Sequence, residues 1–330
     1  MKIIKTATIF LAICLAFPGI SAATVALDPS VVGIGARALG MGRAYTAISG
    51  NPDSLFLNPA ALTKISQLGM TSMYSRLLSE VNYLMLGAVK PLDANYFGIG
   101  YLGASLGDIQ SAVRDPNTGR ITFEAGTVNY YNNIIYLTYA REVLDKLSAG
   151  LNFKLYSQGY SGGGDTAGGY DADLGLKYSY SDWLNIGFLQ RNFIPASMGG
   201  RIKWASGAEE GIGTSSRLGV NYEPGNYNLS LDYEFYLTRS APGLLKLGAE
   251  WWLVPNLALR VGSDQDPLET NLTAGLSFIF SGFQFDYAYH QYGSLSAHTT
   301  HTFSLSYGIT KGSPGTKKTA YVIVNKPADK

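Results

Sequence analysis

The sequence predicts an all-β fold, an antiparallel transmembrane β-barrel of about 14 strands with an N-terminal hatch inside its lumen. The first indication is strict alternation of apolar and polar residues in many short segments. The second is composition, because charged residues make up only 15% of the 330 residues while the chain carries 39 Gly and 23 Tyr. The third is the spacing of the connections, in which tight turns alternate with long loops.

The first 23 residues have the pattern of a secretory signal peptide. Lys2 and Lys5 precede an apolar run at 7–16, and a Pro-Gly pair then leads to a small-residue cleavage site after Ala22 or Ala23. The apolar run is too short to be retained as a membrane helix. We therefore predict an exported protein whose signal peptide, residues 1–23, is removed.

Removal of this segment excludes several classes of chemistry. Cys14, the only cysteine, is lost with it, so disulfides, cysteine metal sites and cysteine catalysis are excluded. The formal net charge falls from +1 to −1 when Lys2 and Lys5 are removed, which leaves no basic footprint for nucleic acid. We expect no cofactor, no metal site and no nucleic-acid partner.

Residues 24–66 differ from the rest of the chain because they are rich in Gly and Ala and lack sustained alternation. Two Asn-Pro pairs offer helix starts in which the Asn side chain can accept hydrogen bonds from free backbone N–H groups. A compact segment of this kind before the first strand predicts a hatch folded into the barrel. The candidate hatch residues are Gly40, Gly42, Asn51, Pro52, Asn58, Pro59 and Ala60.

Residues 67–309 carry the alternation that predicts the barrel. Between Tyr227 and Phe235 every second residue is apolar or aromatic, and the residues between them include Asn228, Asp232 and Glu234. A strand places each of these two sets on its own face. The strands are predicted to begin near Leu68, Val81, Asn95, Asn132, Lys146, Gly169, Trp183, Ser215, Asn226, Leu244, Asn256, Leu268, Gly282 and His298.

The connections between these strands fall into two kinds. From the fourth strand on, every second connection is tight, as at 181–182 and 254–255, whereas the longest connections are 105–131, 158–168 and 192–214. Short turns on one rim and long loops on the other are typical of barrels in the bacterial outer membrane. An even strand number then places both termini in the periplasm. The alternative is a soluble β-sandwich, whose apolar residues would face inward.

The polar face of the strands is predicted to line the lumen. The inferred lumen network is Lys154, Asp171, Asp173, Lys177, Arg217, Asp232, Glu234, Lys246, Glu250, Arg260 and Asp286. Positive and negative side chains are nearly equal in number, which argues against an ion-selective pore built from rings of charges of one sign. A structural ion-pair network is the favoured interpretation and a permeation pathway is the alternative. The two coexist if the network surrounds a narrow channel.

Two motifs near the N-terminus carry a resemblance to a known family. The stretch 35–44 reads Gly-Ala-Arg-Ala-Leu-Gly-Met-Gly-Arg-Ala, and 51–60 reads Asn-Pro-Asp-Ser-Leu-Phe-Leu-Asn-Pro-Ala. Together they resemble the opening of the PorV/PorQ family, which belongs to the FadL-like superfamily of fatty-acid-transporter barrels. Segments 247–252, 256–262 and 285–289 are similar to the late strands of that family.

The resemblance implies two functions. FadL-like barrels take up small hydrophobic molecules, and the hatch around Asn58-Pro59-Ala60 would then gate passage. PorV-like proteins are outer-membrane partners in type IX protein secretion, which would use the long loops as a docking surface. The expected partners are therefore the lipid bilayer of the outer membrane, a hydrophobic small molecule, or secretion-system proteins.

Two regions depart from this pattern. Residues 310–330 form a basic tail beyond the last predicted strand, where such barrels often finish on a terminal aromatic residue. We expect a solvated periplasmic extension, with an edge strand at 320–324 that joins a partner as the alternative. His290, His298 and His301 lie near the last loop, but rim histidines beside a polar loop are commoner than a catalytic group, so no enzyme activity is predicted.

Overall fold

A computed structural model describes residues 25–26, 28–77, 80–115, 117–162, 164–236, 242–266, 269–293 and 299–309. The predicted signal peptide and the basic tail lie outside these residues. The wall is built from β2 (Gly69–Leu77), β3 (Val81–Leu92), β4 (Asn95–Arg114), β5 (Ile121–Leu144), β6 (Leu147–Tyr160), β7 (Thr166–Ser181), β8 (Leu184–Arg191), β11 (Ser215–Tyr222), β12 (Tyr227–Phe235), β13 (Leu244–Val254), β14 (Leu257–Asp266), β15 (Glu269–Phe280), β16 (Phe283–Gln291) and β17 (Thr299–Tyr307).

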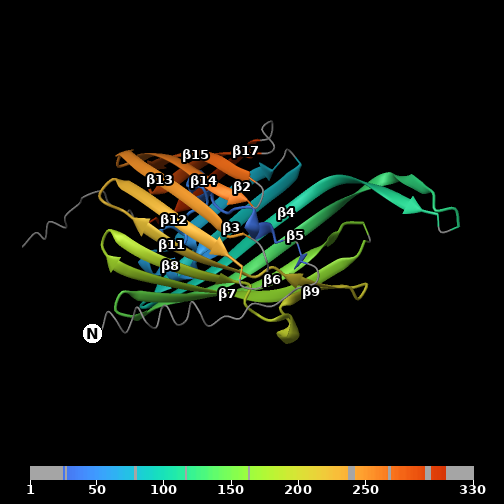
Figure 1. The fold of residues 1–330 in the computed structure, drawn as a ribbon, viewed down its shortest axis with the longest axis horizontal. Helices are drawn as coiled ribbons and strands as arrows, with labels where there is room; N and C mark the ends of the chain where they lie inside the picture. The colour runs from blue at the N-terminus through green and yellow to red at the C-terminus, as the bar shows by residue number, and fades with distance from the viewer. Residues whose placement is uncertain are drawn as a thin grey trace, which may run out of the picture.

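These strands form one closed barrel (Figure 1). Each pairs antiparallel with its neighbour, β8 pairs with β11, and β17 pairs with β2 through Thr302↔Ser75 to Tyr307↔Met70. The prediction of a closed antiparallel barrel of 14 strands is confirmed. No helix among the residues described here is long and apolar enough to cross a membrane.

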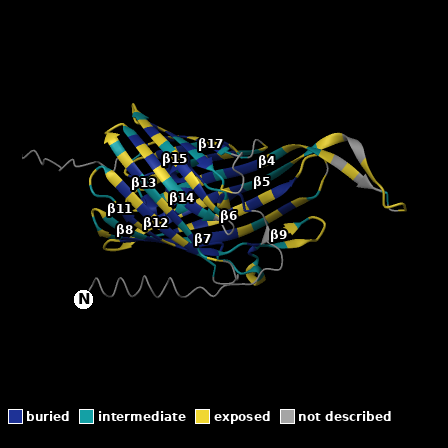
Figure 2. Cartoon of the chain, turned by 45° about the horizontal axis from the view of Figure 1, so that its top comes forward, coloured by how far each residue is buried: buried dark blue, intermediate teal, exposed yellow. Residues whose placement is uncertain are grey.

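The two faces of the wall have the polarity expected of a barrel in lipid. On β12 the exposed fractions of Leu229 and Leu231 are 47% and 44%, whereas those of Asp232 and Glu234 are 0% and 4%. The same alternation of buried and exposed residues runs along the neighbouring strands (Figure 2). A soluble sandwich would bury the apolar face and expose the polar one. The outward apolar face therefore excludes that alternative.

The predicted loop 105–131 is largely a β-hairpin, which corrects both that loop and the predicted start of the fourth strand near Asn132. β4 continues to Arg114 and β5 begins at Ile121, so the two strands project beyond the rest of the barrel (Figure 1). The turn between them is organised by Asp115, whose carboxylate accepts hydrogen bonds from Asn117 N at 2.8 Å and Thr118 Oγ1 at 2.8 Å. This turn, followed by the β-forming Ile-Thr-Phe, closes a hairpin.

The predicted loop 192–214 also contains regular structure. It holds a 3-10 turn, η3 (Ala196–Met198), and a short hairpin, β9 (Arg201–Trp204) and β10 (Glu209–Ile212). β9 pairs with β7, and β10 pairs in parallel with β1 (Val25–Ala26). The first described residues therefore lie at the rim of the long loops. The even strand number therefore determines only where the barrel wall begins and ends, and not where the N-terminus lies. The first wall strand begins near Met70 and the last ends near Tyr307, and these two residues pair at the other rim.

From β1 the chain runs toward the first wall strand through short helical turns. These are η1 (Pro29–Val31), α2 (Ala36–Gly40), α3 (Ser54–Leu57) and η2 (Pro59–Lys64). We call residues 28–66 the N-terminal segment. It packs against strands on both sides of the barrel, since α2 contacts β14 to β17 while η2 contacts β4 to β7.

The inner wall has an apolar side as well as a charged one. Met85, Leu102 and Ile134 on β3, β4 and β5 are fully buried at 0% exposure and belong to one core cluster with Leu55 of α3. Phe56 lies edge to face against Tyr136 with ring centroids 5.0 Å apart. The N-terminal segment therefore has an apolar half-wall on one side and a charged half-wall on the other.

Candidate functional site

The candidate site is the boundary between the N-terminal segment and the inner wall. All eleven residues of the predicted lumen network lie on the inner side, with exposed fractions from 0% to 7%. They divide into separate groups, and several of these groups bind the N-terminal segment. The alternation rule therefore placed the side chains, but it did not reveal what they bind.

The first group centres on Glu250 of β13. Arg37 of α2 donates two hydrogen bonds to its carboxylate, from Nε at 2.9 Å and from Nη2 at 2.6 Å. Arg260 of β14 donates from Nε at 2.6 Å to the same carboxylate, and its Nη1 lies 3.1 Å from Asp286 of β16. A buried carboxylate shared by two arginines is stable because the paired charges offset each other's desolvation. Glu250 thus ties α2 to the wall.

A second attachment joins Arg43 to Asp264 on β14. Arg43 donates from Nε at 3.0 Å and from Nη2 at 2.5 Å, which is the bidentate geometry of an arginine–carboxylate pair. Asn271 donates to the same carboxylate at 2.9 Å, and His290 Nε2 lies 3.2 Å from it. Asp264 is absent from the predicted lumen network, although it has the same parity on its strand as the inward-facing Arg260. Alternation alone could have found it.

Two carboxylates of β12 have different roles. Asp232 accepts hydrogen bonds from the backbone N of Tyr45 at 3.0 Å and of Thr46 at 2.9 Å, and from Thr46 Oγ1 at 2.6 Å. Glu234 instead pairs within the wall, with Arg217 at 2.7 Å and with Lys246. Asp232 is therefore an attachment for the backbone of the N-terminal segment, whereas Glu234 stabilises the wall.

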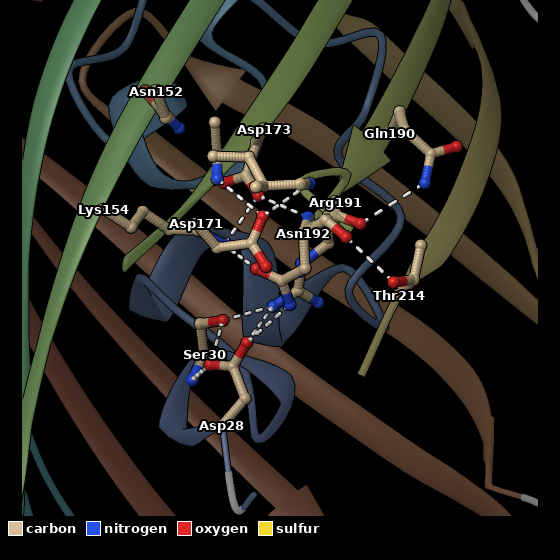
Figure 3. Close-up of polar contacts among 12 residues, drawn as sticks. Asp28, Ser30, Asn152, Lys154, Asp171, Asp173, Gln190, Arg191, Asn192 and Thr214 are labelled. Atoms are coloured by element: carbon tan, nitrogen blue, oxygen red, sulfur yellow. Dashed lines mark hydrogen bonds and ion pairs between the residues drawn. The ribbon is translucent and has the colours of Figure 1, made fainter. Parts of the chain in front are cut away.

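A further cluster joins η1 to β6, β7 and β8 (Figure 3). Lys154 lies 2.6 Å from Asp173, and Arg191 lies 3.6 Å from Asp28. Asn192 connects the two pairs, since its Nδ2 donates to Asp28 at 3.2 Å and its Oδ1 accepts from Lys154. Burial raises the pKa of Asp28, but the attraction of Arg191 and Lys154 outweighs it and lowers that pKa below its ordinary value. Asp28 is therefore held as an anion.

Besides Asp232, two further residues of the predicted network lie outside these ion pairs. Asp171 accepts hydrogen bonds from the backbone N of Ala172 at 2.7 Å and of Ile194 at 3.0 Å. The bond from Ile194 holds the start of the loop 192–214 against β7. Lys177 donates to Ser179 Oγ at 3.2 Å. The predicted network is therefore not continuous.

The Asn58-Pro59-Ala60 motif lies at the centre of the N-terminal segment. Asn58 caps η2 by accepting a hydrogen bond from Ala60 N at 3.2 Å, and its Nδ2 donates to Thr46 O at 2.7 Å and to Leu176 O of β7 at 3.2 Å. The wall approaches closely here because Gly175 has no side chain. A Cβ at that position would lie 2.1 Å from Asn58 Oδ1.

The other candidate hatch residues are also buried, and each packs closely against its neighbours. Gly42 has φ of +58°, and a Cβ on it would lie 2.4 Å from Leu247 O of β13. Gly40 lies against Gly275 of β15, where a Cβ would approach its Cα to 3.2 Å. Asn51 accepts a hydrogen bond from Asp53 N at 2.9 Å, and Pro52 lies against the start of β2.

Asp53 is a buried carboxylate of the N-terminal segment that the sequence analysis did not single out. Its exposed fraction is 0%, Thr71 of β2 donates a hydrogen bond to Oδ1, and Oδ2 has no described hydrogen-bond partner. Burial raises the pKa of Asp53 to about 6, Thr71 opposes this, and the nearby Asp286 adds to it. Asp53 is thus a titratable group at the contact between the segment and the first wall strand.

A small enclosed cavity of about 20 Å³ lies between the N-terminal segment and β2, β3, β16 and β17. Leu39, Met73 and Tyr83 supply apolar lining, and His290 and Thr300 supply polar atoms. A cavity of this size holds about one water molecule. A ligand larger than water would therefore need the segment to move in order to enter this cavity.

Two of the three histidines near the last loop lie on opposite faces of the wall. His290 faces the lumen beside Asp264, whereas His301 is exposed on the outer face, and His298 lies outside the described residues. Among the residues that the structure describes, no group of three or more His, Cys, Asp and Glu could hold a metal ion.

Comparison with known proteins identifies the fold. No protein-family model and no curated protein matches the chain. The toluene transporter TbuX of Ralstonia pickettii is similar in structure, at 13% identity over 84% of this chain and 99% of that one, with a TM-score of 0.60. The Pseudomonas putida toluene transporter TodX matches at 14% identity over 86% and 98%, with a TM-score of 0.59. A Pseudomonas aeruginosa FadL homologue matches at 11% identity over 89% and 100%, with a TM-score of 0.55. The chain therefore shares the barrel fold of these FadL-like proteins.

Proposed function

We propose that this protein is an outer-membrane channel for the passive uptake of small hydrophobic molecules, and that its N-terminal segment is a movable hatch. The observation that carries the proposal is the attachment of the segment to the inner wall at Glu250, Asp264 and Asp232. A passage filled in this way opens only when those contacts break.

The chemistry of the inner wall fits a hydrophobic cargo. Displacement of the N-terminal segment exposes the apolar half-wall formed by Met85, Leu102 and Ile134 to the lumen. Apolar ligand sites are typically lined by such residues with a few polar groups that fix orientation. The resemblance of the barrel to toluene transporters supports a small hydrocarbon as the ligand.

The test is uptake of a radiolabelled long-chain fatty acid and of a monoaromatic hydrocarbon into proteoliposomes. Two cysteines introduced as Ala36→Cys and Ser304→Cys tether the segment to β17 when oxidised, since Ala36 N lies 2.8 Å from Ser304 Oγ. We expect uptake by the reduced barrel, loss of uptake on oxidation, and recovery with reductant.

The single variant Ala36→Cys is the matched control and should transport equally in both redox states. Equal uptake by the tethered and free barrels would show that the segment does not gate. Absence of uptake by the reduced and wild-type barrels would refute the channel itself.

A second function is favoured by the projecting β4–β5 hairpin and by the structured loop 192–214. In this alternative the protein resembles PorV and docks secreted cargo or other secretion-system proteins at the long-loop rim. Hydrophobic uptake does not require a hairpin that extends beyond the barrel (Figure 1). Replacement of residues 107–129 by a short turn should abolish cargo docking and leave hydrocarbon uptake intact. Cargo docking that survives this replacement, together with a loss of hydrocarbon uptake, would favour the uptake function alone.

A further inference from the structure

The outer surface of β2, β3, β4 and β17 is hollowed where lipid chains would lie. A groove of about 530 Å³ is bounded by outward-facing side chains that include Ser72, Leu86, Ala88, Ile99 and Leu305. The outer surface is hollowed here because the outward-facing Ser72 and Ala88 carry small side chains between the larger Leu86, Ile99 and Leu305. The groove is therefore wide enough for hydrocarbon chains but offers almost no polar contact.

A row of polar side chains crosses β16, β17, β2 and β3 closer to the long-loop rim. Tyr289 pairs with His301, and Arg76 pairs with Asn82. Since Thr302 pairs with Ser75, the same register sets His301 beside Arg76. All four positions have the outward parity of their strands, and the side chains of Arg76 and His301 are exposed. Four neighbouring strands set about 4.8 Å apart give the row a width of roughly 15 Å.

Hydrogen bonds hold parts of this row in place. Tyr287 Oη lies 2.8 Å from His301 Nδ1, and Tyr74 Oη donates to Asn82 Oδ1 at 3.2 Å. Arg76 lies four residues from Ser72, which places the row about 13 Å along the strands from the groove. A headgroup bound by the row would therefore send its chains over Tyr74 into the groove.

We propose that this surface, the outer row with its groove, binds a phosphorylated glycolipid of the outer leaflet. The arginine and the histidine complement phosphate, tyrosine and asparagine suit a sugar headgroup, and the groove takes acyl chains. The proposal depends on placement of the long-loop rim at the cell surface, as in the function proposed above. It does not depend on transport.

A second groove on the opposite side shows what distinguishes the first. It measures about 700 Å³ and includes Leu229, Ala249 and Ser263 in its lining. Toward the long-loop rim its strands carry Tyr233, Leu245 and Gln265 at outward positions, and none of these is charged. Apolar hollows therefore occur on both sides of the barrel, but among the residues that the structure describes a cation lies in line with the first groove and not with the second.

The test is native mass spectrometry of the full barrel with added bis-phosphorylated lipid A, phosphatidylglycerol or phosphatidylethanolamine as separate probes. We expect wild-type barrel to retain lipid A most strongly. Arg76→Gln should weaken retention by about tenfold to a hundredfold through loss of a charge-assisted contact. Ala88→Phe, which fills the groove, should weaken it as well.

Two matched variants provide the controls, and heat-modifiable gel mobility confirms that each barrel is folded. Arg141→Gln removes an outward-facing arginine of β5 at the other rim, and Ala249→Phe fills the second groove. Both should retain lipid A as the wild type does. Equal losses in test and control variants, or equal retention of phosphatidylglycerol and lipid A, would overturn the proposal. Hydrocarbon uptake by the same variants reports separately on the channel function.

Discussion

At the scale of single residues, the odd or even position of a residue along its strand predicts whether its side chain faces the lumen. This is nearly all that the sequence reveals about single residues. It placed all eleven predicted lumen residues on the inner face, and the same rule covers Asp264. It could not reveal Arg37, Arg43 or Asp28, because these residues lie in an irregular segment with no period. Their partners on the barrel wall are more than 160 positions away in the chain, so no local pattern connects them.

The titration of Asp53 gives a prediction at this scale. Its pKa is raised from 3.8 to about 6, so between these values the folded barrel holds a proton that the unfolded chain releases. Stability therefore falls as pH rises through this window, by about 3 kcal/mol in all. Asp53→Asn should raise the melting temperature at neutral pH but not near pH 4, as followed by heat-modifiable mobility. A gain of the same size at both pH values would contradict the assigned titration.

The outward position of Leu231 gives a second prediction. Its exposed fraction is 44% and it lies midway along β12. Leu231→Arg should destabilise the barrel in bilayers by about 2–4 kcal/mol, whereas Leu253→Arg, near the turn after β13, should cost at most about 1 kcal/mol. Reversible unfolding in urea measures both. Equal costs would show that the assigned membrane depth is wrong.

At the scale of elements, strands were predictable and their extensions were not. Starts at Val81, Asn95, Ser215 and Leu244 agree with the structure. The sequence predicts a loop in place of the β4–β5 hairpin because these strands continue beyond the rest of the barrel, where no lipid enforces alternation. Composition distinguishes a Gly- and Ala-rich stretch before the first strand, but its close approach to the wall depends on glycines in distant strands.

Such a glycine allows a test of how the N-terminal segment is positioned. Gly175→Ala should displace Asn58, because the new Cβ would fall 2.1 Å from Asn58 Oδ1. Gly168→Ala is the matched control, since its Cβ meets only Tyr156 O at 3.7 Å. In an Ala60→Cys background, thiol labelling should rise for the first variant and stay low for the second. Unchanged labelling in both would show that the segment tolerates the added methyl group.

At the scale of the whole molecule, the projecting hairpin is separate from the barrel wall. β3 pairs with β4 only up to Leu106, and β6 pairs with β5 only from Tyr130. Replacement of residues 107–129 by a short turn should therefore leave the melting temperature within about 2 °C, measured by the same mobility shift. A large loss would show that the hairpin supports the wall.

The closure of β17 on β2 has a consequence for the order of events during assembly. β2 and β17 are separated by most of the chain. Their pairing closes the barrel wall around the N-terminal segment. Once the seam is shut, the leading residues could reach the far rim only by threading through a packed interior. An open sheet that curls around them meets no such obstacle. We therefore expect the N-terminal segment to be in place before β17 pairs with β2.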